Sequence, residues 1–545
     1  MVRLILLIVL LGAYTSAYGQ HSMMEMAAEK PEKLMTGLGP VHHRVSTSNA
    51  EAQKFFEQGL ALIYAFNHEE AIRSFKQAAE LDPKMAMAYW GIAYALGPNI
   101  NLDVDPEREK AAFDAVQRAM ELAANAPENE RDYINALSKR YSDTPGADLK
   151  KLAINYKDAI GKVAKKYPDD LDASVLYAES IMDLNPWKLW TNDGKPAEGT
   201  EELVSVLESV LKKSPNHIGA IHYYIHAVEA SPNPERASMY LDTLKKLTPS
   251  AGHLVHMPAH IYIRTGDYAA AVKSNREAQL VDETFIKQRG QNGIYPMMYY
   301  THNIHFETVA SALEGNYRGA INAAKKLENF ILPMAKEMPM VEGFAATPML
   351  VNVRFRKWDE LIKTPQPEKN FTILNAFWHF SRGVAFAGKG QIEKAEGEHK
   401  LFAESRKAIP ADVALGLNSQ SDVFDIAEDV LSGEIAKARH DYKKALRSFT
   451  QGVEAEGKLS YDEPPDWWLF VRESLGGALL LNKNPATAEK VFREDLLRNR
   501  KNGRSLFGLL QSLKAQKKTK EAAKIQRQFN EAWKNADVVL KVNEL

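Results

Sequence analysis

The segment FFEQGLALIYAFNHEEAIRSFKQAAELDP, residues 55–83, decides the fold. Its apolar residues recur with helical period on both sides of a short polar turn. Small residues, Gly59 and Ala71, stand at spacings that let two short helices cross closely, Phe75 is one of the apolar positions of the frame, and Pro83 ends the second helix. The segment therefore predicts a pair of antiparallel helices whose apolar positions stack on a following pair.

The same frame recurs along the chain, which indicates a repeat array. Helix-ending prolines recur after Pro83, the last two of them 34 residues apart with insertions of several residues inside the earlier units, and no stretch alternates with period two. We therefore expect an all-α fold of about eleven or twelve helix pairs from Asn49 to the C-terminus, with almost no sheet. The prolines that mark the early units are Pro127, Pro168, Pro215 and Pro249.

These spacings resemble the tetratricopeptide repeat family over nearly the whole chain after residue 48. The resemblance implies a right-handed superhelical solenoid. Several phrases are also similar to those of exported bacterial repeat proteins without an assigned activity, so they leave the chemistry to the residues. The phrases are residues 64–68, 87–91, Pro186-Trp187 with Trp190, 256–260 and 463–465.

The N-terminus predicts export. Arg3, an apolar run over 4–11 and small residues before Gly19 have the layout of a cleaved secretory signal peptide. We expect a periplasmic or secreted protein. The predicted divisions are a signal peptide (1–19), a flexible segment (20–48), an N-terminal repeat array (49–289), central repeats (290–367) and a C-terminal array (368–545).

Composition narrows the function classes. The chain has 69 basic and 70 acidic residues among 545, so no strong field favours nucleic acid or an anionic membrane. We expect neither nucleic-acid binding nor a membrane span. The absence of cysteine excludes disulfides and thiolate ligands, so any metal site must use nitrogen and oxygen ligands.

Histidines are concentrated in one region. Of the 15 in the chain, seven lie between residues 222 and 305, at helical spacings such as i, i+3 and i+4. In the tetratricopeptide frame they occupy first-helix positions that, by the resemblance, line a concave groove. Glu229 extends the first stripe. The seven are His222, His226, His253, His256, His260, His302 and His305.

This pattern predicts a metal site in the groove, made by the seven histidines and Glu229. An i, i+4 pair of imidazoles can chelate one ion from one helix, and neighbouring helices can share it. Imidazole with a little carboxylate suits a divalent transition metal such as copper, zinc, iron or nickel. No glutamate follows the first histidine of a pair, so the zinc-peptidase motif is absent.

Five further residues are predicted to line the groove. Glu179 and Asp183 are candidates for distal ligands or for orienting imidazoles. Trp90 and Tyr94 are candidates for apolar contact with a ligand, and Tyr300 borders the third histidine helix.

Three functions remain open from the sequence. The first is a metal-binding repeat protein, acting as a metalloenzyme or in metal handling. The second is a scaffold that binds a peptide or partner protein along the groove, with the histidines as polar contacts. The third is an accessory factor of an envelope or polymer-degrading system. Whether the protein is an enzyme is not decided by any motif.

Overall fold

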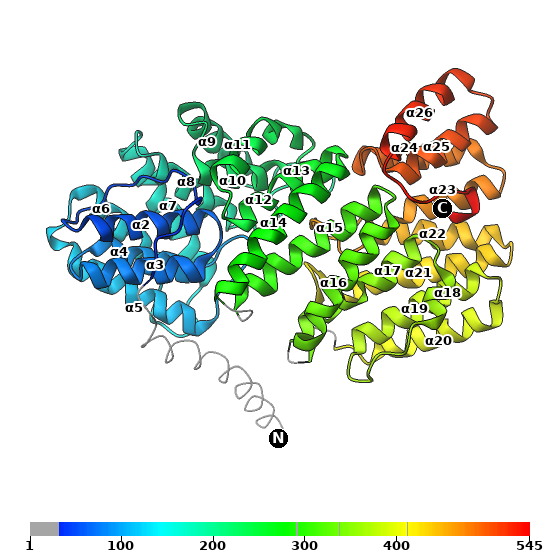
Figure 1. The fold of residues 1–545 in the computed structure, drawn as a ribbon, viewed down its shortest axis with the longest axis horizontal. Coiled ribbons are helices and arrows are strands. Elements are labelled where there is room, and N and C mark those ends of the chain that lie inside the picture. Colours follow the sequence, from blue (N-terminus) through cyan, green and yellow to red (C-terminus); the bar gives the residue numbers. More distant parts are fainter. Residues whose placement is uncertain (1–31, 290–292, 337, 411–412) are drawn as a thin grey trace. The chain divides into compact units, whose positions relative to one another are not determined.

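The computed structural model describes residues 32–289, 293–336, 338–410 and 413–545, and it divides into two compact units (Figure 1). Unit 1 contains the described residues up to Pro186 together with Ser205–Ala220, and unit 2 contains Trp187–Val204 and Ile221–Leu545. The predicted signal peptide lies outside the described residues. Both units are built of helices, and each is described by itself below.

Unit 1 begins with the pair that the sequence predicts. Asn49 caps its first helix by accepting hydrogen bonds from the N–H groups of Glu51 and Ala52, and Asn67 caps the second through the N–H of Glu70. The helices lying within this unit are α2 (Ala50–Tyr64), α3 (His68–Leu81), α4 (Ala86–Leu96), α5 (Pro106–Leu122), α6 (Glu128–Leu137), α7 (Leu149–Lys166) and α8 (Leu171–Met182), with a short 3-10 turn, η2 (Ala123–Asn125).

Glycines permit the close helix crossings. A Cβ atom on Gly59 would lie 2.6 Å from the Phe75 ring, and one on Gly91 would lie 2.4 Å from the same ring. Phe75 of α3 therefore fills the space between α2 and α4, which only residues without a side chain leave open. The predicted role of the small residues in residues 55–83 is confirmed.

The described part of the N-terminal segment, residues 32–48, has no helix or strand but is bonded to the first pair. The N–H of Glu32 donates to Gln77 at 2.8 Å, and the N–H of Met35 donates to Gln58 at 2.6 Å. Leu38 is buried. The segment thus packs along α2 and α3.

Two helices have residues in both units, α9 (Thr200–Lys213) and α10 (Ile218–Glu229). The helices that lie within unit 2 are α11 (Leu241–Leu247), α12 (Gly252–His256), α13 (Pro258–Thr265), α14 (Tyr268–Arg289), α15 (Thr301–Leu313), α16 (Tyr317–Ala335), α17 (Thr347–Arg354), α18 (Trp358–Lys363), α19 (Thr372–Gly388), α20 (Ile392–Lys407), α21 (Gln420–Ala438), α22 (Tyr442–Glu456), α23 (Val471–Leu481), α24 (Pro485–Arg498), α25 (Gly503–Ala515) and α26 (Thr519–Ala532).

Shorter elements complete unit 2. Two-residue strands, β1 (Ala414–Leu415) and β2 (Asn418–Ser419), pair antiparallel. The remaining turns are η3 (Pro234–Tyr240), η4 (Pro296–Tyr300), η5 (Pro339–Ala346) and η6 (Val542–Glu544), of which η4 is a π-helix.

The predicted fold class, all-α with almost no sheet, is confirmed. Taken two at a time in chain order, with α12 and α13 counted as one interrupted helix, the helices of the described residues make twelve consecutive pairs. The close-crossing device also returns in the C-terminal part, where a Cβ on Gly476 would lie 2.3 Å from the Phe492 ring. That spacing of sixteen residues is the same as from Gly59 to Phe75.

The central histidine helix differs from the expectation of one continuous helix. It is interrupted at Met257, because Pro258 lacks the N–H that would continue the hydrogen-bond ladder. Met257 keeps right-handed helical angles (φ −48°, ψ −36°), so His260 on α13 still follows His253 and His256 on α12.

No helix within the described ranges is both long and apolar enough to cross a membrane.

Candidate metal centre

Six of the seven predicted histidines gather into two groups inside unit 2. In each group, one ligand atom per residue lies within 4.8 Å of the others. Cluster A, as we name the first, draws on α10 and α12, and cluster B draws on α12, α13 and α15. Cluster A is His222, His226 and His253; cluster B is His256, His260 and His302.

Cluster B is centred on three Nε2 atoms. The Nε2 of His256 lies 2.9 Å from that of His260 and 3.2 Å from that of His302. Two nitrogen ligands of a tetrahedral zinc ion, each about 2.0–2.1 Å from the metal, lie about 3.3 Å apart. The three nitrogens are therefore close to the separation that a shared ion requires.

The outer nitrogens of cluster B fix which ring nitrogen holds the proton. Asn275 donates its Nδ2–H to the carbonyl of Ala271, so its Oδ1 faces the Nδ1 of His256, at 2.7 Å. A carboxylate oxygen of Glu229 contacts the Nδ1 of His260. Both Nδ1 atoms thus carry hydrogen, and in the neutral rings both Nε2 atoms present lone pairs. Two lone pairs 2.9 Å apart repel each other unless a cation lies between them.

Glu229 connects the two clusters. Its second oxygen accepts from the Nδ1 of His226, in cluster A, at 2.8 Å. The carboxylate therefore lies against the outer nitrogens of His226 and His260 and orients both rings. The sequence predicts Glu229 as one of the ligands. In the structure its carboxylate lies against the outer nitrogens of two of the predicted ligand histidines, His226 and His260.

Cluster A is held by a similar set of contacts. The Nε2 atoms of His222 and His253 lie 3.1 Å apart, and the ring centroids of His222 and His226 are 4.9 Å apart. The backbone N–H of His253 donates to the hydroxyl of Tyr295, and this hydroxyl donates to the carboxylate of Asp282. These bonds fix the start of α12, where the Gly252 backbone passes close to Asp282.

Burial disfavours the charged form of four of the cluster imidazoles. Desolvation, followed by the charges of neighbouring imidazoles, holds the pKa of His253, His256 and His302 well below the ordinary value of 6.5. Burial also lowers the pKa of His226, against the opposing charge of Glu229. Burial alone would raise the pKa of Glu229, but His260 and His226 lower it to about 2, so this carboxylate stays ionised.

Aromatic rings enclose the clusters. Phe306, fully buried on α15, lies with its ring centroid 5.1 Å from that of His256 and 5.3 Å from that of His260. The Tyr299 ring lies 4.7 Å from that of His253. The ring centroid of Trp187, in the insertion before α9, lies 6.0 Å from that of His226. An apolar enclosure strengthens every electrostatic interaction inside it.

His305, the seventh predicted histidine, is not part of either cluster. It packs against Phe344, at 5.2 Å between ring centroids, and burial lowers its pKa to about 4. Three positions along an α-helix leave the two side chains about 60° apart, and here that difference brings His305 against Phe344 instead of the cluster. Among the described residues, no group of three possible metal ligands whose atoms lie within 4.8 Å of one another includes His305.

Four of the five other predicted groove residues lie inside unit 1. Trp90 stacks on Tyr94, whose hydroxyl donates to Glu179 at 2.6 Å. Asp183 forms a buried ion pair with Arg140 at 2.7 Å. All four are buried, and together they form a polar network within the interior of that unit.

The fifth, Tyr300, is in unit 2, where its hydroxyl donates to Glu283 at 3.0 Å. The ammonium group of Lys326 lies 5.3 Å from the centre of its ring. For all five residues, contact with a ligand stays a prediction.

Asn275, Phe306 and Tyr295 complete the site and were not predicted from the sequence. Asn275 and Phe306 are ordinary helix residues in the sequence, and their function as supports depends on a neighbouring helix. Tyr295 lies near the start of the predicted central repeats (290–367), where the sequence indicates only a division between repeat arrays. No sequence signal separates these three from residues that simply pack.

A family comparison matches one repeat of the chain. A tetratricopeptide repeat family model matches residues 52–85. A search of curated proteins finds no match. Similar solved structures include Cut9 in the APC/C hetero-tetramer Cut9–Hcn1 (12% identity, TM-score 0.33, covering 92% of this chain and 81% of that chain).

The human IFIT1 dimer with PPP-AAAA is 13% identical, with a TM-score of 0.36 and coverage of 89% of this chain and 91% of that chain. Yeast Tom70 is 12% identical, with a TM-score of 0.30 and coverage of 87% and 96%. The family match itself covers the segment from which the fold was predicted, so the chain contains a tetratricopeptide repeat at residues 52–85.

Proposed function

We propose that unit 2 holds a metal centre in which cluster A and cluster B each bind one divalent transition-metal ion. The observation that carries the proposal is the pair of Nε2 atoms of His256 and His260, 2.9 Å apart with both outer nitrogens facing acceptors. A cation between these atoms turns their repulsion into two ligand bonds.

A proton could also lie between two imidazoles, but it would join only two of the three nitrogens. Cluster B presents a third nitrogen, from His302, at 3.2 Å. One ionised carboxylate, Glu229, lies against two of the six imidazoles, and burial disfavours the imidazolium form of His253, His256 and His302. A metal ion binds neutral imidazole, so at neutral pH protons do not compete with it for these three rings.

The ligand chemistry restricts the ion and its coordination. Three imidazoles suit zinc, copper or iron, and none of the softer sulfur ligands is present. Three protein ligands leave at least one coordination position open, the arrangement of reactive rather than purely structural zinc sites. The carboxylate of Glu229 would hold one ligand of each ion in orientation and balance part of the charge.

The tetratricopeptide repeat supports a second function, the binding of a peptide or protein partner. Repeats of this kind bind such partners, and the matched repeat is the first helix pair of unit 1, α2 and α3. This function and the metal centre involve different units and do not exclude each other.

We also propose that the protein is exported. The layout of residues 1–19 supports cleavage near Gly19. N-terminal sequencing of the protein from its native host tests this directly, and a mature chain that retains Arg3 would contradict it.

The metal centre is tested by elemental analysis of untagged protein purified from metal-supplemented medium. We expect close to two ions per chain. His226→Ala, in cluster A, and His260→Ala, in cluster B, should each remove about one ion while helicity measured by circular dichroism stays unchanged. His399→Ala is the control, because His399 pairs with Glu428 outside both clusters.

Wild-type protein that binds no zinc, copper or iron at pH 7 to 8, after removal and re-addition of each metal, would overturn the proposal. Full metal content in both cluster variants would overturn it as well. The histidines would then be polar contacts, and partner binding would be the remaining function.

A further inference from the structure

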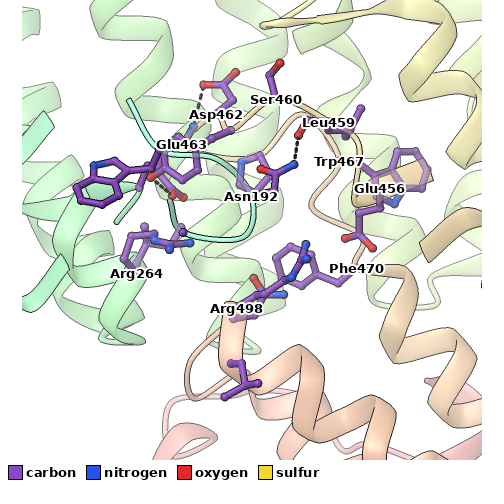
Figure 2. A pocket seen from close by; sticks show the side chains of 18 of the residues that line it. Asn192, Arg264, Glu456, Leu459, Ser460, Asp462, Glu463, Trp467, Phe470 and Arg498 are labelled. Carbon is purple, nitrogen blue, oxygen red and sulfur yellow. Dashed lines mark hydrogen bonds between the residues drawn. The ribbon is translucent and has the colours of Figure 1, made fainter. Parts of the chain in front are cut away.

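A cavity of about 490 Å³ lies in unit 2 beside the proposed metal centre (Figure 2). Ile263 and Arg264, which line it, follow His260 on α13, and Ala230 is the residue after Glu229 at the end of α10. Its volume is within the range of about 300–1,000 Å³ that small-molecule sites occupy.

The cavity wall is built by hydrogen bonds between distant parts of the chain. Asn192 donates from Nδ2 to the carbonyls of Gly457 and Leu459, at 2.9 and 3.0 Å, as Figure 2 shows for Leu459. Trp190 donates its indole N–H to the carbonyl of Ala227 at 2.8 Å. These contacts hold the insertion before α9 against the loop after α22, so the cavity is a defined site.

Three guanidinium groups from three helices reach this cavity. Arg264 donates its Nε–H to the carbonyl of Glu229 at 3.0 Å and lies over the Tyr461 ring. Arg472 is mostly buried, and its Nε has no hydrogen-bond partner among the described residues. Arg498 is exposed and lies at the cavity edge in Figure 2.

The carboxyl groups of the cavity cancel these charges only in part. Glu456 lies 4.0 Å from the Nη1 of Arg472, and desolvation raises its pKa to about 8. Desolvation also raises the pKa of Glu463 to about 7 and of Asp466 to about 6, and it holds the pKa of Asp462 well above its usual range. At pH 7 Asp466 is therefore mostly ionised and Glu463 about half ionised, while Glu456 and Asp462 are mostly protonated, and Asp193 is exposed at the edge.

The rest of the lining mixes polar residues, such as Asn192, Ser231 and Ser460, with apolar surface. Trp467 and Phe470 are buried with part of their surface against the cavity, and Leu459 and Tyr268 add further carbon surface. A buried guanidinium nitrogen without a partner is costly, and a carboxylate supplies the acceptor that matches it best.

We propose that this cavity binds the carboxylate of a small organic acid with an apolar body, held by Arg264, Arg472 and Arg498. The site goes beyond the metal centre, because none of its contacts requires a metal ion.

N-acetyl-phenylalanine is a suitable probe, and the neutral N-acetyl-phenylalaninamide is its matched control. Calorimetry and the fluorescence of Trp190 and Trp467 should report saturable binding of the acid and little or none of the amide. Arg472→Gln should weaken binding about 10- to 100-fold, as expected for loss of a hydrogen bond to a charged group. Arg498→Gln should also weaken binding of the acid. Because Arg498 is exposed, this variant should fold, and it tests the proposal if the Arg472 variant does not fold.

Arg447→Gln, an exposed arginine on α22 outside the cavity lining, is the control and should leave binding unchanged. Equal binding of the acid and the amide would overturn the proposal, as would binding that neither cavity variant weakens. Binding of inorganic phosphate without binding of the acid would also overturn it, because the apolar lining would then have no role. The measurements are made on metal-free and metal-loaded protein, so failure of the metal proposal is recognised separately.

Discussion

Two groups of buried histidines, one in each unit, have opposite surroundings. In unit 1, Asp172 lies between His43, at 2.8 Å, and His217, at 3.2 Å, and also accepts from the Tyr64 hydroxyl. In unit 2, the single carboxylate of Glu229 contacts two of the six imidazoles, His226 and His260, and most of the inner nitrogens of the clusters face other imidazoles. The number of carboxylates per imidazole separates the two arrangements.

The number of carboxylates per imidazole decides whether a site suits a proton or a metal ion. Burial opposes protonation of His43, but the hydrogen bond and charge of Asp172 outweigh it and raise the pKa of His43. In clusters A and B no carboxylate meets the inner nitrogens, and the pKa values of His253, His256 and His302 fall. A proton satisfies the unit 1 group, whereas the unit 2 clusters suit a cation that binds neutral imidazole.

The largest expected effect is acid destabilisation of metal-free unit 2. His305, with a pKa of about 4 when folded and 6.5 when unfolded, binds its proton first in the unfolded state. Stability is therefore lost as pH falls from 6.5 to 4, by about 3 kcal/mol from His305 alone. His253, His256 and His302 add to this loss.

The pH dependence of stability from the His43–Asp172 pair in unit 1 has the opposite sign. The raised pKa of His43 contributes stability that is complete below 6.5, and the lowered pKa of Asp172 contributes stability above 3.8. Hydrogen exchange between pH 6.5 and 4, corrected for intrinsic rates, should show loss of protection in α12 and α15, while α8, which carries Asp172, is unchanged. Burial also lowers the pKa of His68 on α3 to about 3, so a loss of protection in α3 and its partner α2 is expected as well and does not test the comparison. Loss of protection in α8 equal to that in α12 and α15 would contradict the comparison.

Removing the carboxylate of unit 1 should cost about 2 to 3 kcal/mol. Asp172→Asn leaves two imidazoles and a tyrosine hydroxyl without their shared acceptor charge, although the side chain is 15% exposed and solvent offsets part of the loss. Chemical denaturation measures the change, with the exposed Asp169→Asn as control. A change below about 0.5 kcal/mol would show that the three contacts are not coupled.

Removing the charge that connects the clusters should weaken metal binding about 10- to 100-fold. Glu229→Gln keeps the size of the side chain but no longer offers an ionised acceptor to both His226 and His260. Competition with a chelator gives the affinity, and the exposed Glu201→Gln serves as control. An unchanged affinity would mean that Glu229 does not orient the ligands.

The smallest expected effect tests the specificity of the clusters. His399 pairs with Glu428 where both side chains are about one-third exposed, so His399→Ala should change stability by less than about 1 kcal/mol. Metal content should not change. Loss of one ion in this variant would place a metal outside clusters A and B.

Much of the fold could be predicted from the sequence, because short-range rules govern it. The spacing of Gly59, Ala71 and Phe75 predicts the crossing of α2 and α3, and the structure confirms it through the 2.6 Å approach of the Gly59 position to the Phe75 ring. The interruption at Pro258 follows from a missing donor and was not predicted, although its cause is visible in the sequence.

The candidate site could be predicted only in part. Helical spacing places His222 and His226 on one face, and their grouping with other histidines follows from the stacking of successive pairs. The same reasoning assigned His305 to the site, but its ring packs against Phe344. Spacing defines a face of a helix, whereas the neighbouring helix decides what that face meets.

By itself the sequence determined an all-α repeat chain, without cysteine ligands, that concentrates its histidines in three consecutive repeats. Only the tertiary structure decided that Glu229 and Asn275 lie against the outer nitrogens of His260 and His256, so that two lone pairs face each other. The reason is physical. Helical periodicity is a property of a few neighbouring residues, while the proton position on an imidazole depends on which acceptor a different helix brings within 3 Å.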